Sequence, residues 1–161
     1  MQFEDIIAKL REEHGEEIIV EVNEEASPKM ITVKSEDLLQ VSEVLYKNES
    51  LFFDMLSCIT GVDNGPEMNT MEVIYNFYSI PFEHSLMLKI ILPRENPAAP
   101  SLVNIWKTAD WHERETYDLL GIHFDGHPDL RRLLMPADWE GHPLRKDYKN
   151  LEYYRGIKVE Y

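Results

Sequence analysis

Cysteine is almost absent from this sequence: Cys58 is the single one among 161 residues. One thiol cannot form a disulfide within the chain, and it cannot supply the several thiolates that hold an iron–sulfur cluster. Cys58 lies in a predicted strand, where a small buried side chain is the ordinary role. An iron–sulfur centre that works with this chain is therefore expected in another protein.

Basic side chains are also scarce. The chain has 16 lysines and arginines against 30 acidic residues, which gives a formal net charge of −14. Nucleic-acid binding needs clustered positive charge, so this composition argues against it. The imbalance is uneven, because residues 126–161 hold seven basic and six acidic side chains whereas residues 1–125 hold nine and 24. The C-terminal end is therefore a different kind of surface.

Long hydrophobic runs are missing. The longest strongly apolar stretch, LMLKIILP from Leu86, is far shorter than the roughly 20 residues that a membrane-spanning helix needs. The N-terminus, MQFEDIIAKLREEHG, lacks the basic start and apolar core of a signal peptide. We therefore expect a cytoplasmic protein whose association with a membrane, if any, depends on a partner.

Motifs for independent catalysis are lacking as well. The sequence has no GxGxxG loop, no Walker-type loop and no serine nucleophile elbow. Acidic residues are numerous, but no spacing singles out an acid–base pair. An active site within this chain is thus a weak hypothesis.

The first part of the chain predicts helices and strands in alternation. Phe3, Ile6, Ile7 and Leu10 form the apolar stripe of a helix that Gly15 would end. Alternating apolar residues predict strands at 18–22 and 31–33. Ser35 stands where the N-cap of a second helix is expected.

The middle of the chain predicts a sheet followed by a third helix. The apolar runs at 51–60, 70–79 and 85–92 are joined by short turns, which favours antiparallel neighbours. A helix is expected from about Asp110 to Leu120, with Asp110 and Glu113 as a capping box and Gly121 as its C-terminal cap. These patterns together predict an α+β fold in which about three helices pack on a mostly antiparallel or mixed sheet.

The last part of the chain is broken by proline and glycine. The segment GHPDLRRLLMPADWEGHPLRKDY, residues 126–148, repeats Gly-His-Pro and cannot form a long helix or a plain strand. We expect a core domain over residues 1–120 and an extended C-terminal arm over residues 121–161. Disorder is the alternative, but the many leucines, tyrosines and arginines of the arm favour burial against a surface, either its own domain or a partner.

One face of the third helix carries a distinctive set of side chains. Trp111, Arg114, Glu115 and Asp118 fall within an arc of roughly 100°. They could form ordinary exposed ion pairs, or a docking face whose charges pair with a partner or with arginines of the arm. The histidines next to this helix are weak metal ligands by spacing, and we expect His127 and His142 to make hydrogen bonds in Gly-His-Pro turns.

The stretch ERETYDLLGIHFDGHPDLRRLL, residues 113–134, resembles the signature of the 30 kDa subunit family of respiratory complex I, the NADH-quinone oxidoreductase. The likeness includes Glu113-Arg114-Glu115, Asp118 before two leucines, His127, and Arg131 before Leu133-Leu134. It continues through MPADWEGHPLRKDY at 135–148, and SCITGVD at 57–63 also fits.

The resemblance implies a subunit without an active site or cofactor of its own. FMN, iron–sulfur clusters and quinone would lie in partner subunits, and the C-terminal arm would wrap the quinone-site (49 kDa-type) subunit beside the iron–sulfur subunits. The complex would lie on the cytoplasmic side of the inner membrane, with this chain attached indirectly. The candidate interface residues are Trp111, Glu113, Arg114, Glu115, Asp118, His127, Arg131, Arg132, Leu133, Leu134, Trp139, His142, Leu144, Arg145, Lys146 and Tyr148.

Two alternatives stay open at the level of sequence. A subunit of a related membrane-bound hydrogenase, or of another complex I relative with a different electron donor, would carry the same signature. A small metal-dependent hydrolase would use His112, His123 and His127 with Glu113 or Glu115.

Overall fold

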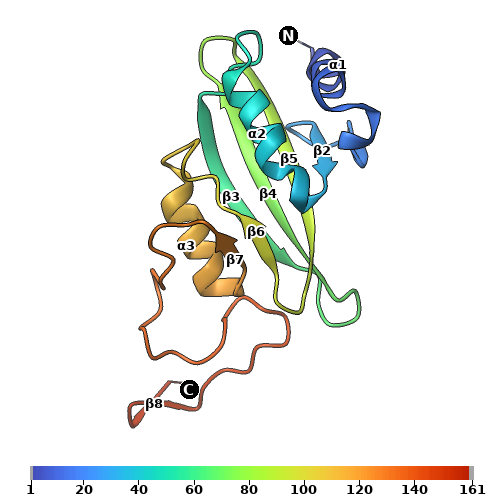
Figure 1. The fold of residues 1–161 in the computed structure, drawn as a ribbon. Coiled ribbons are helices and arrows are strands. Elements are labelled where there is room, and N and C mark those ends of the chain that lie inside the picture. Colours follow the sequence, from blue (N-terminus) through green and yellow to red (C-terminus); the bar gives the residue numbers. More distant parts are fainter. Residues whose placement is uncertain (1, 160–161) are drawn as a thin grey trace.

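A five-stranded mixed sheet forms the centre of the protein, for which a computed structural model describes residues 2–159. Its strand order is β1-β2-β5-β4-β3, with β3 and β1 at the edges (Figure 1). β4 is antiparallel to both β3 and β5, as predicted, whereas β2 runs parallel to β5. The strands are β1 (Glu21–Asn23), β2 (Met30–Val33), β3 (Met55–Asp63), β4 (Thr70–Ser79) and β5 (His84–Pro93).

Alternating side chains explain which face of the sheet is buried. Met71, Val73, Tyr75 and Phe77 of β4 point to one side and are buried, while the residues between them are half-buried. This period of two is the pattern of a sheet with one face against the core. The strands therefore supply most of one hydrophobic core, which the helices close.

Two helices near the N-terminus cover part of the sheet. Helix α1 (Phe3–His14) ends at Gly15 as predicted, and α2 (Leu38–Lys47) buries its apolar side. The prediction that Ser35 caps the second helix is wrong, since a short 3-10 helix, η2 (Ser35–Asp37), comes before α2. A second 3-10 helix, η1 (Glu16–Ile18), takes the place of the expected start of the first strand, so β1 begins three residues late.

The third helix, α3 (Ala109–Leu120), lies beside β3 and ends at Gly121 with φ 76° (Figure 1). After it the chain does not become irregular at once, contrary to expectation. Strand β7 (His123–Asp125) pairs in parallel with β6 (Ala98–Pro100), and Ile122 and Phe124 are buried in the core. The irregular part of the arm starts at Gly126.

From Gly126 to Val159 the only paired strands are β8 (Tyr153–Tyr154) and β9 (Ile157–Lys158), which form a small hairpin. The predicted α+β class, with three α-helices among the described residues and a mixed sheet, is confirmed. None of the helices within residues 2–159 is long and apolar enough to cross a membrane.

Candidate functional site

The C-terminal arm folds back over the C-terminal end of α3 (Figure 1). The last four carbonyl groups of an α-helix have no partner within the helix and need donors from elsewhere. Here all four have one. Gly121 N donates to the Tyr117 carbonyl, and Leu144 N donates to the Leu119 carbonyl. The Asp118 carbonyl accepts hydrogen bonds from His142 Nδ1 and from Arg132 Nη1. Arg145 Nε donates to the Leu120 carbonyl.

Two of these donors are arginine side chains, whose positive charge also interacts favourably with the helix dipole. The C-terminus of a helix carries a partial negative charge that favours cations. Arg145 Nε lies 2.7 Å from the Leu120 carbonyl oxygen. The second terminal nitrogen of Arg132, Nη2, donates a hydrogen bond to the Gly141 carbonyl at 2.9 Å. The arm therefore acts as the cap of α3.

Asp118 is the main polar anchor of the arm. Its side chain is fully buried, and its Oδ2 accepts hydrogen bonds from the backbone amides of Leu133, Leu134 and Met135 at 2.7–3.0 Å. Arg132 Nη1 donates to its Oδ1 at 2.9 Å. Burial alone would raise the pKa of Asp118, but the three amides and the guanidinium outweigh it and hold the pKa below the ordinary value of 3.8.

Glu113 has a different role from the one its sequence position predicts. It forms no capping box with Asp110: its buried carboxylate accepts a hydrogen bond from Ser101 Oγ at 2.6 Å and from Leu102 N at 2.7 Å. Burial raises the pKa of Glu113 above its ordinary value. Glu113 thus fixes the segment before α3 and is not on the exposed face of the helix.

His127 and His142 stabilise the arm in different ways. The His127 side chain is enclosed, its Nε2 donates to the Asp110 carbonyl at 3.1 Å, and its Nδ1 accepts from Asp129 N at 3.0 Å. This is the turn hydrogen bond predicted from the sequence. His142 instead reaches back to α3, where its ring would lie 2.6 Å from a Cβ placed on Gly121, so that only glycine fits there.

A second anchor of the arm lies at the end of β3. Asp63 is buried and accepts two hydrogen bonds from the Arg94 guanidinium, at 2.8 and 3.0 Å, and one from Lys146 N at 2.8 Å. Arg94 also pairs with Asp147 of the arm. The hydrogen bonds from Arg94 lower the pKa of Asp63 far below its ordinary range. Sequence reasoning missed Asp63 and Arg94, because nothing in their spacing links them to residues 146–147.

Other predicted interface residues lie on the surface of this region. Trp111, Leu134 and Leu144 are 65%, 61% and 60% exposed, and Arg131, Glu115 and Lys146 are exposed too. Arg114 lies 5.7 Å from the Trp111 ring, and its Nε donates to the Arg131 carbonyl. The half-buried Trp139 donates its indole N–H to the Tyr148 hydroxyl, while Leu133 is half-buried.

Twelve of the sixteen predicted site residues therefore divide into two groups, while Arg114, Leu133, Trp139 and Tyr148 are half-buried. Side chains of the first group make hydrogen bonds within the chain, and side chains of the second are exposed. The first group is Glu113, Asp118, His127, Arg132, His142 and Arg145; the second is Trp111, Glu115, Arg131, Leu134, Leu144 and Lys146.

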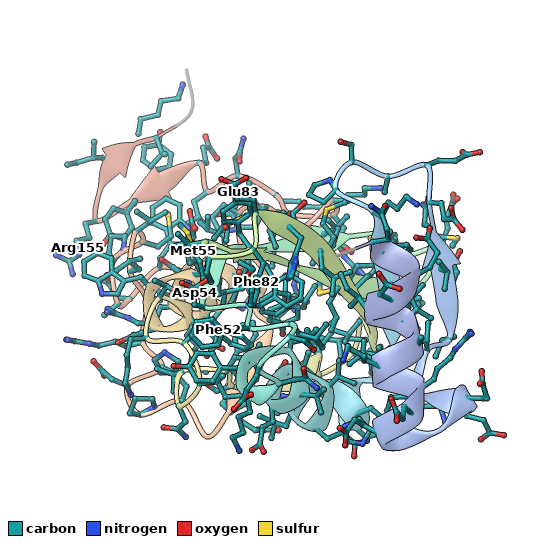
Figure 2. All side chains as sticks on the ribbon, turned by 90° about the horizontal axis from the view of Figure 1, so that it is seen from above. Phe52, Asp54, Met55, Phe82, Glu83 and Arg155 are labelled. Carbon is teal, nitrogen blue, oxygen red and sulfur yellow. The ribbon has the colours of Figure 1, made fainter. Side chains whose placement is uncertain are left out.

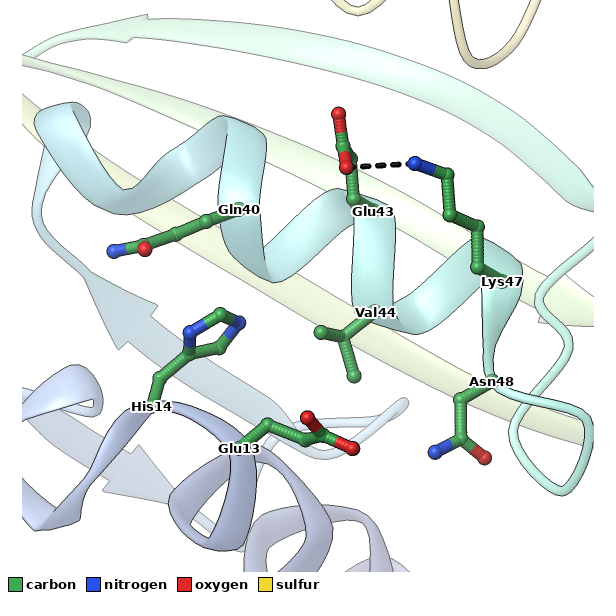
Figure 3. Close-up of a pocket in the computed structure, with 7 residues that line it drawn as sticks. All are labelled: Glu13, His14, Gln40, Glu43, Val44, Lys47 and Asn48. Atoms are coloured by element: carbon green, nitrogen blue, oxygen red, sulfur yellow. Dashed lines mark hydrogen bonds and ion pairs between the residues drawn. The ribbon is translucent and has the colours of Figure 1, made fainter.

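Potential metal ligands do not gather into a site among the described residues. Within residues 2–159, no group of three or more His, Cys, Asp or Glu side chains is placed to hold a metal ion. His127 has both ring nitrogens hydrogen-bonded, which leaves neither for a metal. An open groove of about 350 Å³ between α1 and α2, lined by Glu13, His14 and the Glu43–Lys47 ion pair, shows no nucleophile with a neighbouring base (Figure 3).

Solved structures with a similar fold include the following two. A trypsin-resistant fragment of Nqo5 matches with a TM-score of 0.65 and 26% identity, covering 81% of this chain and 100% of that one. A chain of the membrane-bound sulfane sulfur reductase, an archaeal respiratory membrane complex, matches with a TM-score of 0.75 over 93% of this chain and 87% of its own. That second likeness, at 21% identity, shows the fold alone.

Sequence relatives then narrow this fold to one family. The C subunit of NADH-quinone oxidoreductase from Chloroherpeton thalassium is 48% identical over 81% of this chain, and that from Chlorobium phaeobacteroides is 38% identical over 94%. The profile of the respiratory-chain NADH dehydrogenase 30 kDa subunit matches residues 31–154. The chain belongs to this family. It spans 54% of the Chloroherpeton relative, about half its length, and 92% of the Chlorobium relative.

Proposed function

We propose that this chain is a non-catalytic scaffold subunit in the peripheral, hydrophilic part of an NADH-quinone oxidoreductase. That complex passes electrons from NADH through FMN and iron–sulfur centres to quinone and couples the transfer to proton translocation. Membership of the 30 kDa subunit family is the observation that carries the proposal. With one cysteine, this chain leaves the iron–sulfur chemistry to its partners.

The C-terminal arm is the surface that we assign to the quinone-site subunit, with iron–sulfur subunits nearby. Leu134 and Leu144 have large apolar side chains that are exposed. Their backbone amides are hydrogen-bonded to the Asp118 carboxylate and to the Leu119 carbonyl at the end of α3. A segment held in one conformation loses less conformational entropy on binding than a free one. Apolar anchors on such a segment are therefore efficient contacts for a partner.

Charged side chains around these anchors would set the orientation of the partner. Arg131 and Lys146 are exposed, and the part of the chain after residue 125 is nearly neutral within a strongly acidic protein. Acidic groups on the partner would meet these cations, which favours correct docking more than raw affinity. Attachment to the cytoplasmic side of the inner membrane would then be indirect, through the complex.

The experiment is an affinity purification through a tag at the N-terminus from membranes in mild detergent, followed by mass spectrometry. We expect the quinone-site subunit, iron–sulfur subunits and a flavoprotein to co-purify. A hydrogenase catalytic subunit in their place would support the related-complex alternative. Recovery of the chain alone would contradict the proposal.

Variants of the exposed anchors test the role of the arm. Leu134→Asp and Leu144→Asp place a charge where we expect an apolar contact, and Arg131→Ala removes an exposed cation; each should lower recovery of the quinone-site subunit. Val20→Asp is the matched control, because Val20 is also exposed but lies on the β1 side of the sheet. Equal recovery with all four variants would show that the arm is not the interface.

A further inference from the structure

The end of the sheet away from the C-terminal arm carries an exposed apolar patch. It is formed by Phe52, Met55, Ile80 and Phe82, which lie at the start of β3 and in the turn between β4 and β5 and which we call the tip. β3 runs from Met55 at the tip to Asp63, where Lys146 of the arm is anchored, so these two points are about 26 Å apart at 3.3 Å per residue. A contact at the tip is therefore separate from the anchor of the arm at Asp63.

Hydrogen bonds and ring contacts join the two loops of the tip. Ile80 N donates to Asp54 Oδ1 at 2.9 Å, and His84 Nε2 donates to the Leu51 carbonyl at 2.7 Å. The Phe82 ring stacks on His84, with centroids 5.9 Å apart. Figure 2 shows Phe52, Asp54, Met55, Phe82 and Glu83 together from above. The apolar side chains are thus presented by a fixed framework.

The backbone at the tip keeps apolar groups outside. Phe52 has φ 31° and Glu83 has φ 52°, a left-handed region that is costly for residues other than glycine. Ile80 and Phe82 remain 59% and 46% exposed, although Phe53 and His84, which contact each other in the same region, are buried. A cluster of exposed apolar side chains on a constrained backbone is typical of an interaction site.

Carboxylates surround this patch. Asp5, Glu49 and Phe82 line one open hollow of about 590 Å³, and Asp54 and Glu83 belong to the loops of the tip. Segments 2–5, 48–55 and 79–84 contain neither lysine nor arginine. Their one histidine, His84, is buried, and burial lowers its pKa, which favours the neutral form. Lys47, just outside, is paired with Glu43.

We propose that the tip docks a segment of a partner protein that presents an apolar side chain flanked by lysine or arginine. The apolar side chain would lie on Phe82 and Phe52, and the flanking cations would meet Glu49 and Glu83. Charge complementarity selects this occupant. An anionic lipid surface would be repelled by the carboxylates, and a symmetric second copy would place the same carboxylates against one another. The inference does not rest on the function proposed above.

Protection of a thiol at the tip tests this inference. Ile80→Cys in a Cys58→Ser background, which keeps Phe82 and Phe52 in place, is reacted with a bulky maleimide, first in the purified full chain and then in the assembly that co-purifies with it. Occupancy for nine-tenths of the time would slow labelling about tenfold in the assembly. Equal rates in the two samples would overturn the proposal. Labelling of the purified chain that becomes slower at raised protein concentration, or with phosphatidylglycerol vesicles, would also overturn the proposal.

A zero-length carbodiimide cross-linker tests the chemistry of the partner. In the assembly it should join Glu49 or Glu83 to a lysine of another chain. The double variant Glu49→Gln/Glu83→Gln should remove that cross-link and restore most of the labelling rate. The matched control, Glu17→Gln/Glu25→Gln, changes two exposed carboxylates outside the tip and should leave both unchanged. Protection that survives in the first double variant would contradict a basic partner segment.

The composition of the assembly separates this result from the proposed function. A protected thiol in an assembly without NADH dehydrogenase subunits would contradict only the proposed function. An unprotected thiol in an assembly that contains those subunits would contradict only the docking at the tip. Recovery of the chain alone would contradict both.

Discussion

The central sheet is held together by side chains that bury one another, whereas the C-terminal arm lies on the surface and is held by a few polar groups. Tyr75 and Phe77 of β4 are fully enclosed. In the arm, Leu134 and Leu144 are mostly exposed, and the backbone beside them is fixed by Asp118 and the carbonyls of α3. Apolar side chains of the arm are therefore available to contact another surface.

This difference means that stability and partner binding can be changed separately. Burial of apolar area is shared by many side chains of the sheet and is lost cooperatively. Several hydrogen bonds of the arm converge on two carboxylates, Asp118 and Asp63, so that a substitution at one of them can release the part of the arm that it holds and leave the sheet intact. Four variants or conditions, in order of decreasing effect, test this separation.

Phe77→Ala should have the largest effect. Removing a buried phenyl ring leaves a cavity and costs about 4 kcal/mol in the free energy of unfolding. Because the arm docks on α3 and β3, the whole chain should lose stability, and amide hydrogen exchange should accelerate in both sheet and arm. Denaturant unfolding measures the change. Ile91→Ala on the exposed side of β5 is the control and should cost far less.

Asp118→Ala should release the arm without unfolding the sheet. The substitution leaves three backbone amides without their acceptor and removes the carboxylate that pairs with Arg132, which should cost about 3 kcal/mol in arm attachment. Hydrogen exchange at Leu133–Met135 should accelerate strongly, while β4 stays protected. The control is Glu115→Ala, an exposed residue on the same helix. Simultaneous exchange of sheet and arm would contradict their separation.

Acid should weaken the arm through the same carboxylate. The pKa of Asp118 is lowered in the folded protein, so its contribution is fully present above the unfolded value of 3.8 and is lost as pH falls through the lower folded pKa. Asp63 acts in the same direction. NMR chemical shifts of the Leu133–Met135 amides should therefore change below pH 4, and Asp118→Asn should abolish that titration. Glu113 changes stability with pH in the opposite direction, because its raised pKa favours the folded protein at low pH.

Arg145→Met should have the smallest effect of the four. It keeps most of the aliphatic volume and removes the hydrogen bond from Nε to the Leu120 carbonyl, which should cost about 1 kcal/mol. Exchange of the Leu144 amide, which bonds to the Leu119 carbonyl, should accelerate modestly. Lys149→Met, at an exposed position of the arm, is the control. An effect as large as that of Asp118→Ala would mean that charge at the helix end, and not Asp118, holds the arm.

Local patterns in the sequence predicted the elements of the core. The stripe of α1, the apolar runs of β4 and β5 and Gly121 at the end of α3 all act within a few residues, and all three predictions are confirmed. Predictions that depended on capping side chains were wrong at Ser35 and Glu113. At Ser35 the chain makes a 3-10 turn first, and Glu113 binds backbone and hydroxyl groups of residues 101–102.

Contacts across long sequence distances were not predictable. Asp63 and Lys146 are 83 residues apart, and no spacing rule connects them. The sequence did place Asp118 on a helix face with charged neighbours and left open whether the arm's own arginines would reach it; Arg132 does. Strand β7 was missed because three residues flanked by glycine carry too short a pattern to tell from a loop.

Hydrogen exchange of the unmodified full chain, without any partner, tests the central claim most directly. If Asp118 holds the arm before a partner arrives, the amides of Leu133, Leu134 and Met135 should exchange far more slowly than in an unfolded peptide. Exchange of these three amides at unfolded rates would mean that the arm becomes ordered only on its partner, and would contradict the role of Asp118 as the anchor of the arm.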